Sequence, residues 1–384
     1  MKKHIDKFEK ICNNINGYEL EKFTRNGAKK MKKVISILLV ALLAFSFAAC
    51  GNTPADTNTP SDAAEATLKF GMGVVAALGN AKDADGDTNG SSEFNVTAVA
   101  VLLDADSKIV AIDLDTAQIK TGWTSEGKLI ATEDFRTKYE KGTDYNMAAF
   151  GTKHDGSEGK PLEWNEQADV FMATAKGKTL DEVKALMGED AYAIGDLATA
   201  GCTIKVADFV NALEKAVANA ADSKATANDK LSLAIVSSGA YSNKDASEDG
   251  DGAAQIDSTI VATVVDADAK VVVAKTDCVQ GKMSFDVAGA VTADTTAEIK
   301  TKLELGDAYN MAAFGTKHDG SEGMPLEWYA QAAAFDAALE GKVVADFAAF
   351  AGADGYATGD LATAGCTMAI GDMIKAATAA ATVA

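Results

Sequence analysis

Apolar and polar positions alternate along residues 94–103 and again along residues 108–115, and a short DADS segment starting at Asp104 separates the two stretches. Val and Ile are concentrated there, and β-branched residues alternating with period two around a turn predict a pair of antiparallel strands. The same pattern returns at residues 258–265 and 270–276. Each pair follows an apolar segment, residues 68–78 or 231–236. The chain therefore predicts two similar small sheets.

Helical spacing of apolar residues follows each predicted strand pair. In the first half, residues 162–175 and 179–187 have this spacing, and a closing helix is expected from about residue 206 to 221. A sheet followed by helices predicts an α+β fold. We expect two tandem homologous domains, each a small antiparallel sheet with packed helices, at residues 66–222 and 229–384.

Two blocks of sequence recur unchanged, 164 positions apart. YNMAAFGTKHDGSEG begins at Tyr145 and at Tyr309, and GDLATAGCT begins at Gly195 and at Gly359. The neighbouring sequence has drifted, since KPLEWNEQADVF has become MPLEWYAQAAAF. A fixed-period repeat indicates tandem duplication. Identity within the blocks indicates that they have the same chemical role in both repeats. A recent or uneven duplication would also leave short stretches of identical sequence.

The first fifty residues are mostly addressing signals, and a tether follows them. Residues 31–49 combine a basic start with an apolar run too short for a comfortable membrane span, as in a signal peptide. The run ends on FAAC, which resembles the lipobox of bacterial lipoproteins and implies acylation of Cys50; an ordinary signal peptide or a retained anchor is the alternative. Residues 50–65 are polar and contain Pro, so we expect a disordered, flexible tether. Residues 1–30 precede a complete signal peptide, and we expect them to be a non-native leader, with translation starting at Met31.

Charge and cysteine content exclude several function classes. From Cys50 onward, the chain has 26 Lys and Arg residues but 52 Asp and Glu residues. Such a surface repels nucleic acid and anionic headgroups, so we expect no nucleic-acid partner and membrane contact by the lipid anchor alone. Five cysteines without a CxxC motif predict neither a disulfide framework nor a zinc site, and Cys278 has no counterpart in the first repeat. With two histidines after the leader and no GxSxG motif, a metal site or a hydrolase has little support.

The recurring AGCT sequence, at residues 200–203 and 364–367, is the candidate chemical site. Its residues predict a glycine turn followed directly by a helix, whose N-terminal N–H groups and dipole suit a phosphate. Thr203 and Thr367 add a hydroxyl that would carry a phosphoester. Alternatively, each threonine only caps the helix, which is the commoner role. Cys202 and Cys366 allow a third interpretation, a redox thiol activated by the helix N-terminus.

The segment DLATAGCTI, with the helix expected after it, resembles the D-x-x-[ST]-G-A-T-x-T segment of FMN-binding domains. The DxDxK turn of the strand pair and the EWxxQAxxF helix are also similar to that family. The resemblance covers nearly all of both repeats. With its lipobox, the chain most closely resembles Gram-positive surface lipoproteins with two flavinylated repeats that serve in extracellular electron transfer. Ala200 and Ala364 stand where the family often has Ser or Thr, and Cys202 and Cys366 replace the commoner Ala.

The resemblance implies two FMN groups, one esterified to Thr203 and one to Thr367 by a flavin transferase. It matches Asp196 and Asp360 to the motif aspartate, which the transferase would read or which would fix the turn. The YNM block would be one wall of the flavin pocket or, alternatively, a well-packed loop. The other candidate cofactor-binding residues are Gly201, Cys202, Gly365 and Cys366 of the turns; Lys153, His154, Lys317 and His318 beside the reduced ring; and Trp164 and Trp328 as stacking partners.

The same resemblance implies a redox carrier rather than a classical enzyme, anchored at the extracellular face of the cell membrane. A membrane quinol or NADH oxidoreductase would be the electron donor, and ferric iron or soluble flavin would be external acceptors. The alternative is a non-redox surface lipoprotein, a solute-binding or interaction module. That alternative explains the anchor, the acidity and the duplication, but it leaves the preservation of GDLATAGCT in both copies unexplained.

Overall fold

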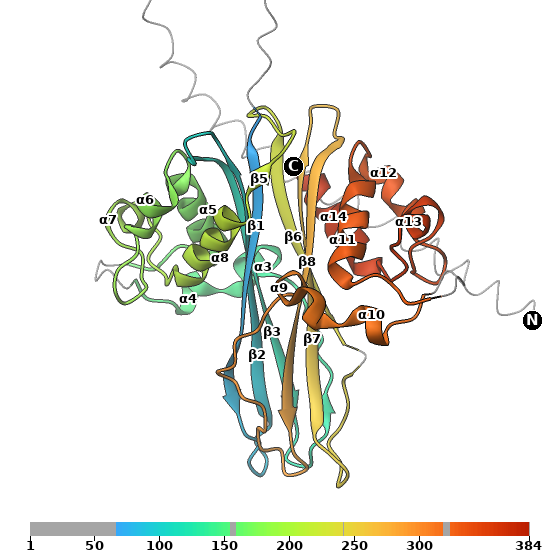
Figure 1. Ribbon diagram of the computed structural model, residues 1–384. Coiled ribbons are helices and arrows are strands. Elements are labelled where there is room, and N and C mark those ends of the chain that lie inside the picture. Colours follow the sequence, from blue (N-terminus) through green and yellow to red (C-terminus); the bar gives the residue numbers. More distant parts are fainter. Residues whose placement is uncertain (1–66, 154–158, 241, 318–322, 384) are drawn as a thin grey trace, which may run out of the picture. The chain divides into compact units, whose positions relative to one another are not determined.

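The computed structural model describes residues 67–153, 159–240, 242–317 and 323–383, which all belong to one compact unit (Figure 1). The predicted leader, signal peptide, Cys50 and the whole tether lie outside the described residues, as do His154 and His318. The elements of the first repeat are β1 (Lys69–Lys82), β2 (Gly90–Leu103), β3 (Ile109–Trp123), β4 (Leu129–Ile130), α3 (Lys138–Lys141), η1 (Gly142–Tyr145), α4 (Met147–Phe150), α5 (Trp164–Ala175), α6 (Leu180–Lys184), α7 (Gly195–Thr199), α8 (Ala207–Ala218) and β5 (Ala221–Asp222). The elements of the second repeat are β6 (Lys230–Gly239), β7 (Gly252–Val265), β8 (Val271–Phe285), α9 (Lys302–Leu305), η2 (Gly306–Tyr309), α10 (Met311–Phe314), α11 (Trp328–Leu339), α12 (Val344–Phe347), η3 (Ala348–Phe350), α13 (Gly359–Thr363) and α14 (Gly371–Val383).

The two predicted strand pairs are antiparallel hairpins, β2–β3 and β7–β8. In the first turn, the Asp104 carboxylate accepts hydrogen bonds from the backbone N–H groups of Asp106 and Lys108, each at 2.9 Å. Asp266 repeats both bonds in the second turn. Short acidic side chains that bond to the backbone ahead of them favour such turns. The α+β fold predicted from the sequence is confirmed.

The apolar segments ahead of each hairpin are strands as well, and they complete the sheets. The first sheet has the strand order β4-β3-β2-β1-β5, and the second has the order β6-β7-β8. Strand β2 is buried on both faces: Val99 and Val101 face one apolar cluster, and Phe94 and Val96 face another. Because successive side chains in a strand point to opposite faces, each sheet must be covered on both sides.

One of these clusters lies between the two sheets and belongs to both repeats. It contains Phe94 and Ile119 from the first sheet and Ile235, Ile256 and Ile260 from the second. At one end of this contact the Trp123 and Phe285 rings stack, with centroids 4.8 Å apart and planes inclined by 2°. The Trp123 indole N–H also donates to the carbonyl of Gly289, at 2.8 Å. The two repeats therefore share a core.

Helices cover the outer face of each sheet, as Figure 1 shows on both flanks of the paired strands. Helices α5 and α8 bury Phe171, Phe209 and Leu213 against the first sheet, and α11 and α14 cover the second in the same way. Helix α8 approaches β1 closely because Gly71 and Gly73 have no side chains: a Cβ at Gly73 would lie 2.2 Å from the Ala212 carbonyl oxygen. The layers are thus helix, sheet, sheet and helix.

Candidate functional site

The two threonines of the repeated AGCT sequence do not lie at helix N-termini. Helix α8 begins at Ala207, with Val206 as its N-cap and no capping side chain, and α14 begins at Gly371. The prediction that the glycine turn leads directly into a helix is therefore wrong, and so is the alternative that Thr203 caps α8. The physical reason is a short backbone pairing between Tyr192 and Lys205, which keeps the residues after Thr203 extended.

The turn itself is present, at the end of a short helix that precedes it. Gly201 has φ 111° and Gly365 has φ 101°, values that side-chain-bearing residues rarely adopt. A Cβ at Gly365 would also lie 2.6 Å from Cδ1 of Leu326, and one at Gly201 would lie 3.0 Å from Cδ1 of Leu162. The glycine thus lets the chain reverse beside the segment that leads into α5 or α11.

Each threonine is buried against a glutamine of helix α5 or α11. Thr203 is 4% exposed and Thr367 is 3% exposed. The Thr203 backbone N–H donates to Oε1 of Gln167 at 2.7 Å, and the Thr367 N–H donates to Oε1 of Gln331 at 2.8 Å. Both glutamines are fully buried, so this carbonyl has no competing water.

The same glutamines connect the site to the YNM block. In the first repeat, the Gln167 amide donates to the Leu162 carbonyl at 2.9 Å and contacts Met147 Sδ at 3.3 Å. The Glu163 carboxylate accepts hydrogen bonds from the N–H groups of Met147 and Ala148. The second repeat reproduces every one of these contacts. The two unchanged blocks and helix α5 therefore meet at one side chain, Gln167.

Sequence reasoning missed these glutamines and glutamates as site residues. The signal was present, because Glu163 and Gln167 are both unchanged at Glu327 and Gln331 while Asn165 and Glu166 between them have changed. A polar residue preserved on the buried face of an amphipathic helix indicates a required hydrogen bond.

The threonine hydroxyls have unused hydrogen-bonding capacity. Thr367 Oγ1 is buried and has no hydrogen-bond partner among the described residues, and Thr203 Oγ1 has only a long contact, 3.4 Å, to Gln167. Buried hydroxyls in folded proteins are normally paired. A threonine Oγ1 without a hydrogen-bond partner, next to a glycine turn, is compatible with a group attached covalently through that oxygen. Ala200 and Ala364 of the same turns are exposed.

Cys202 and Cys366 do not have the environment of reactive thiols. Both are fully buried, and burial raises the pKa of each thiol to about 11. A reactive cysteine needs a stabilised thiolate, whereas an apolar surrounding favours the neutral thiol. Because the helix N-terminus expected beside these residues is absent, the redox-thiol interpretation is not supported.

The other predicted site residues are dispersed. Asp196 and Asp360 are exposed in the first turns of α7 and α13. Lys153 and Lys317 are half-buried near the middle of their YNM blocks, next to the histidines that lie outside the described residues.

Trp164 and Trp328 are core residues, 3% and 4% exposed. The Trp164 ring meets Phe209 edge-on, with centroids 5.7 Å apart, and the Lys138 ammonium lies 5.3 Å from its centroid. Lys302 lies over Trp328 in the same way. The structure places these indoles where they support the helices rather than where a cofactor ring would stack on them.

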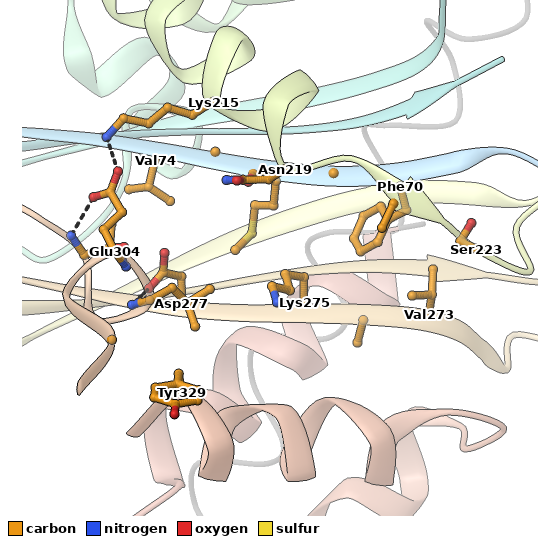
Figure 2. A pocket seen from close by; sticks show the side chains of 18 of the residues that line it. Phe70, Val74, Lys215, Asn219, Ser223, Val273, Lys275, Asp277, Glu304 and Tyr329 are labelled. Atoms are coloured by element: carbon orange, nitrogen blue, oxygen red, sulfur yellow. Dashed lines mark hydrogen bonds and ion pairs between the residues drawn. The ribbon is translucent and has the colours of Figure 1, made fainter. Parts of the chain in front are cut away.

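A groove of about 740 Å³ between the repeats is a second candidate binding site (Figure 2). Phe70 and Val74 of β1 and Val273 of β8 supply apolar walls. The Lys215 ammonium and the Glu304 carboxylate pair across it at 2.5 Å. Neither Thr203 nor Thr367 lines this groove, so the groove is separate from both threonine sites.

Comparison with protein-family models, curated proteins and solved structures finds no match for this chain. Among the described residues, no helix has both the length and the apolar character needed to cross a membrane.

Proposed function

We propose that this chain is a membrane-anchored extracellular electron carrier with FMN esterified to Thr203 and Thr367. When bound, FMN would supply one- and two-electron redox chemistry, while the chain holds the ring and tunes its surroundings. Such a carrier needs no nucleophile or general base of its own. Electrons would come from a membrane quinol or NADH oxidoreductase and pass to external acceptors such as ferric iron or soluble flavin.

One observation carries this proposal: the same threonine-centred arrangement is built twice within sequence that has otherwise drifted. In both copies a glycine turn precedes a buried threonine, a glutamine fixes the backbone of that threonine, and the hydroxyl lacks a good partner among the described residues. The unpaired hydroxyl alone does not carry the proposal, since Oγ1 of Thr263 and of Thr276 is also buried without a partner among the described residues; its recurrence beside the same turn and glutamine does. The duplicated arrangement is better explained by a hydroxyl reserved for attachment.

The layered fold is consistent with two flavins that act separately. Thr203 and Thr367 lie beside residues of the two outer apolar clusters, and the shared core between the sheets separates those clusters. Each attached ring would therefore meet partners on its own flank of the molecule. The acidic surface and the proposed lipid tether would keep the chain beside, but not on, an anionic membrane.

Co-expression with a flavin transferase tests the proposal directly. Denatured protein should stay yellow and carry two added FMN masses, and Thr203→Ala or Thr367→Ala should each remove one. Thr199→Ala and Thr363→Ala are matched controls, since these threonines lie four residues earlier in the same segments. They should leave both masses in place. Colourless denatured protein of unmodified mass would overturn the proposal.

The groove between the repeats favours one alternative, a non-redox lipoprotein that binds a solute. Its volume lies in the range of small-molecule sites, and it combines apolar walls with a few polar groups. This alternative predicts that protein from its own host has no visible absorption and bare threonines. It also leaves the unpaired hydroxyl of Thr367 without a role.

A further inference from the structure

The hydroxyls that we propose as FMN acceptors are enclosed by the folded chain. To form the ester, Thr Oγ1 must attack the flavin-side phosphorus of a flavin dinucleotide held by the transferase. The Oγ1–P bond forms, the phosphoanhydride bond breaks, the nucleoside monophosphate leaves, and the hydroxyl proton passes to a base of the transferase. An oxygen in a residue only 3–4% exposed cannot reach another protein's active site.

The segment that carries each threonine is attached to the core at few points. In residues 195–203, only Leu197, Cys202 and Thr203 are buried, whereas most of the remainder is exposed. A glycine with positive φ lies near each end: Gly195 has φ 60° and Gly201 has φ 111°. The second repeat has the same pattern of burial and equivalent glycines. Segments with few buried contacts and permissive backbone are those that open locally.

One side chain closes each segment onto the rest of the repeat. Gln167 accepts the N–H of Thr203 while its own amide is fixed by the Leu162 carbonyl and Met147 Sδ. Gln331 does the same for Thr367. We call Gln167 and Gln331 the glutamine latches.

We propose that residues 195–203 and 359–367 open as units to present their threonines, and that the glutamine latches set how often they open. This inference rests on the proposed attachment of FMN to Thr203 and Thr367. The latches are positioning residues: they hold the closed state and take no part in the transfer.

Native cysteines report this opening without any flavin. Cys202 and Cys366 precede the threonines and are fully buried, so a thiol reagent reaches them only when the segments open. Cys278 is an internal control, because it is 4% exposed on β8, in the middle of a sheet hairpin. Burial raises the pKa of all three thiols to about 11, so none of them is a reactive thiolate while it is buried.

The experiment is a timed pulse of N-ethylmaleimide on the unmodified full chain under native conditions, with each cysteine read by peptide mass spectrometry. We expect Cys202 and Cys366 to react at least ten-fold faster than Cys278. Gln167→Met, which keeps the side-chain length but removes the hydrogen bonds, should speed Cys202 at least a further ten-fold without changing Cys366 or Cys278. Gln331→Met should act on Cys366 alone.

Equal rates at all three cysteines in the wild-type chain would overturn the inference, and this comparison needs no variant to fold. A latch variant that accelerates all three cysteines together would also overturn it, since that result indicates global destabilisation. If the threonines carry FMN although Cys202 reacts no faster than Cys278, the inferred opening of the segments is refuted while the proposed function stands. Fast opening with threonines that a transferase never modifies would instead overturn the attachment.

Discussion

At the scale of single residues, the two repeats differ in a pair of buried polar side chains. Asp336 and Thr276 are buried in the outer core of the second repeat, where the first has Met172 and Leu114. Asp336 Oδ1 and Thr276 Oγ1 have no hydrogen-bond partners among the described residues, although Asp336 Oδ2 accepts the Thr276 N–H at 3.2 Å. Burial raises the pKa of Asp336 to about 7, because an ionised carboxylate loses its hydration there.

This carboxyl should make stability fall as pH rises. The folded state keeps a proton up to about pH 7, whereas the unfolded carboxyl releases it near its ordinary pKa of 3.8, so the folded state binds more protons between these values. The free energy of unfolding should therefore decrease across this window, by up to about 1.4 kcal/mol per pH unit for this group. Asp336→Met should flatten the decrease in urea titrations at pH 5 and pH 8.

The buried Asp115 and Asp277 have pKa values raised in the same direction and remain in the variant, so some slope should persist. A variant with the same slope as the wild-type chain would show that Asp336 does not titrate in this window.

The second prediction at this scale concerns the turn glycine that lies two residues before each threonine. Gly365→Ala should destabilise the chain by about 1–3 kcal/mol, because φ 101° strains any side-chain-bearing residue and the new Cβ meets Leu326. Gly371→Ala is the control, since nothing lies within 4 Å of its Cβ position. Equal midpoints for the two variants in urea denaturation would contradict the assigned turn conformation.

At the scale of elements, close contact between a helix and a strand fixes the outer layer of the first repeat. Gly71 and Gly73 alternate along β1 with the inward-facing Phe70 and Met72, so the strand presents bare backbone to α8. Helix α8 in turn precedes β5 and the connection to the second repeat. The position of α8 therefore depends on two missing side chains.

Gly73→Ala should displace α8 and destabilise the chain by about 3 kcal/mol, because its Cβ would lie 2.2 Å from the Ala212 carbonyl oxygen and 2.4 Å from the Ala216 nitrogen. Gly79→Ala lies in the same strand, but its nearest neighbour is the movable Asn95 side chain at 3.1 Å. It should cost clearly less. Chemical denaturation followed by circular dichroism distinguishes the two, and a smaller loss for Gly73→Ala would refute this packing.

At the scale of the whole molecule, the core shared by the two sheets makes the repeats interdependent. The ion pairs between them add little, since Lys128–Asp245, Lys215–Glu304 and Lys224–Glu340 are partly exposed and such pairs contribute less than about 1 kcal/mol each. Burial of apolar side chains between the sheets supplies most of the free energy that holds the repeats together. Separating the repeats would expose that whole face of each sheet.

We therefore expect a single cooperative unfolding transition for residues 64–384, with coincident tryptophan-fluorescence and circular-dichroism curves. Phe94→Ala should destabilise the whole unit by about 3–5 kcal/mol, because Phe94 is 2% exposed in the shared core. Phe150→Ala is the matched control: Phe150 is 83% exposed, and its loss should change stability by less than about 0.5 kcal/mol. Two separate transitions would mean that the repeats fold independently.

The sequence alone predicted the strand hairpins, the helices after them and the duplication, because periodicity and local turn chemistry are properties of neighbouring residues. It also drew attention to Thr203 and Thr367. It failed on the residues after these threonines, where a long-range pairing between Tyr192 and Lys205 overrides the local preference for helix. It also could not identify Gln167 as the partner of Thr203, since the two are 36 positions apart and only folding brings them together.

What the sequence by itself determined is the content of each repeat: which segments become strands, where most of the helices follow, and which blocks are identical in the two copies. What only the tertiary structure decided is how those parts are used. It packed the two sheets around one shared core, buried each threonine against its own glutamine and placed the tryptophans in the interior. The physical reason is that burial and hydrogen-bond pairing depend on distant residues, which no local pattern encodes.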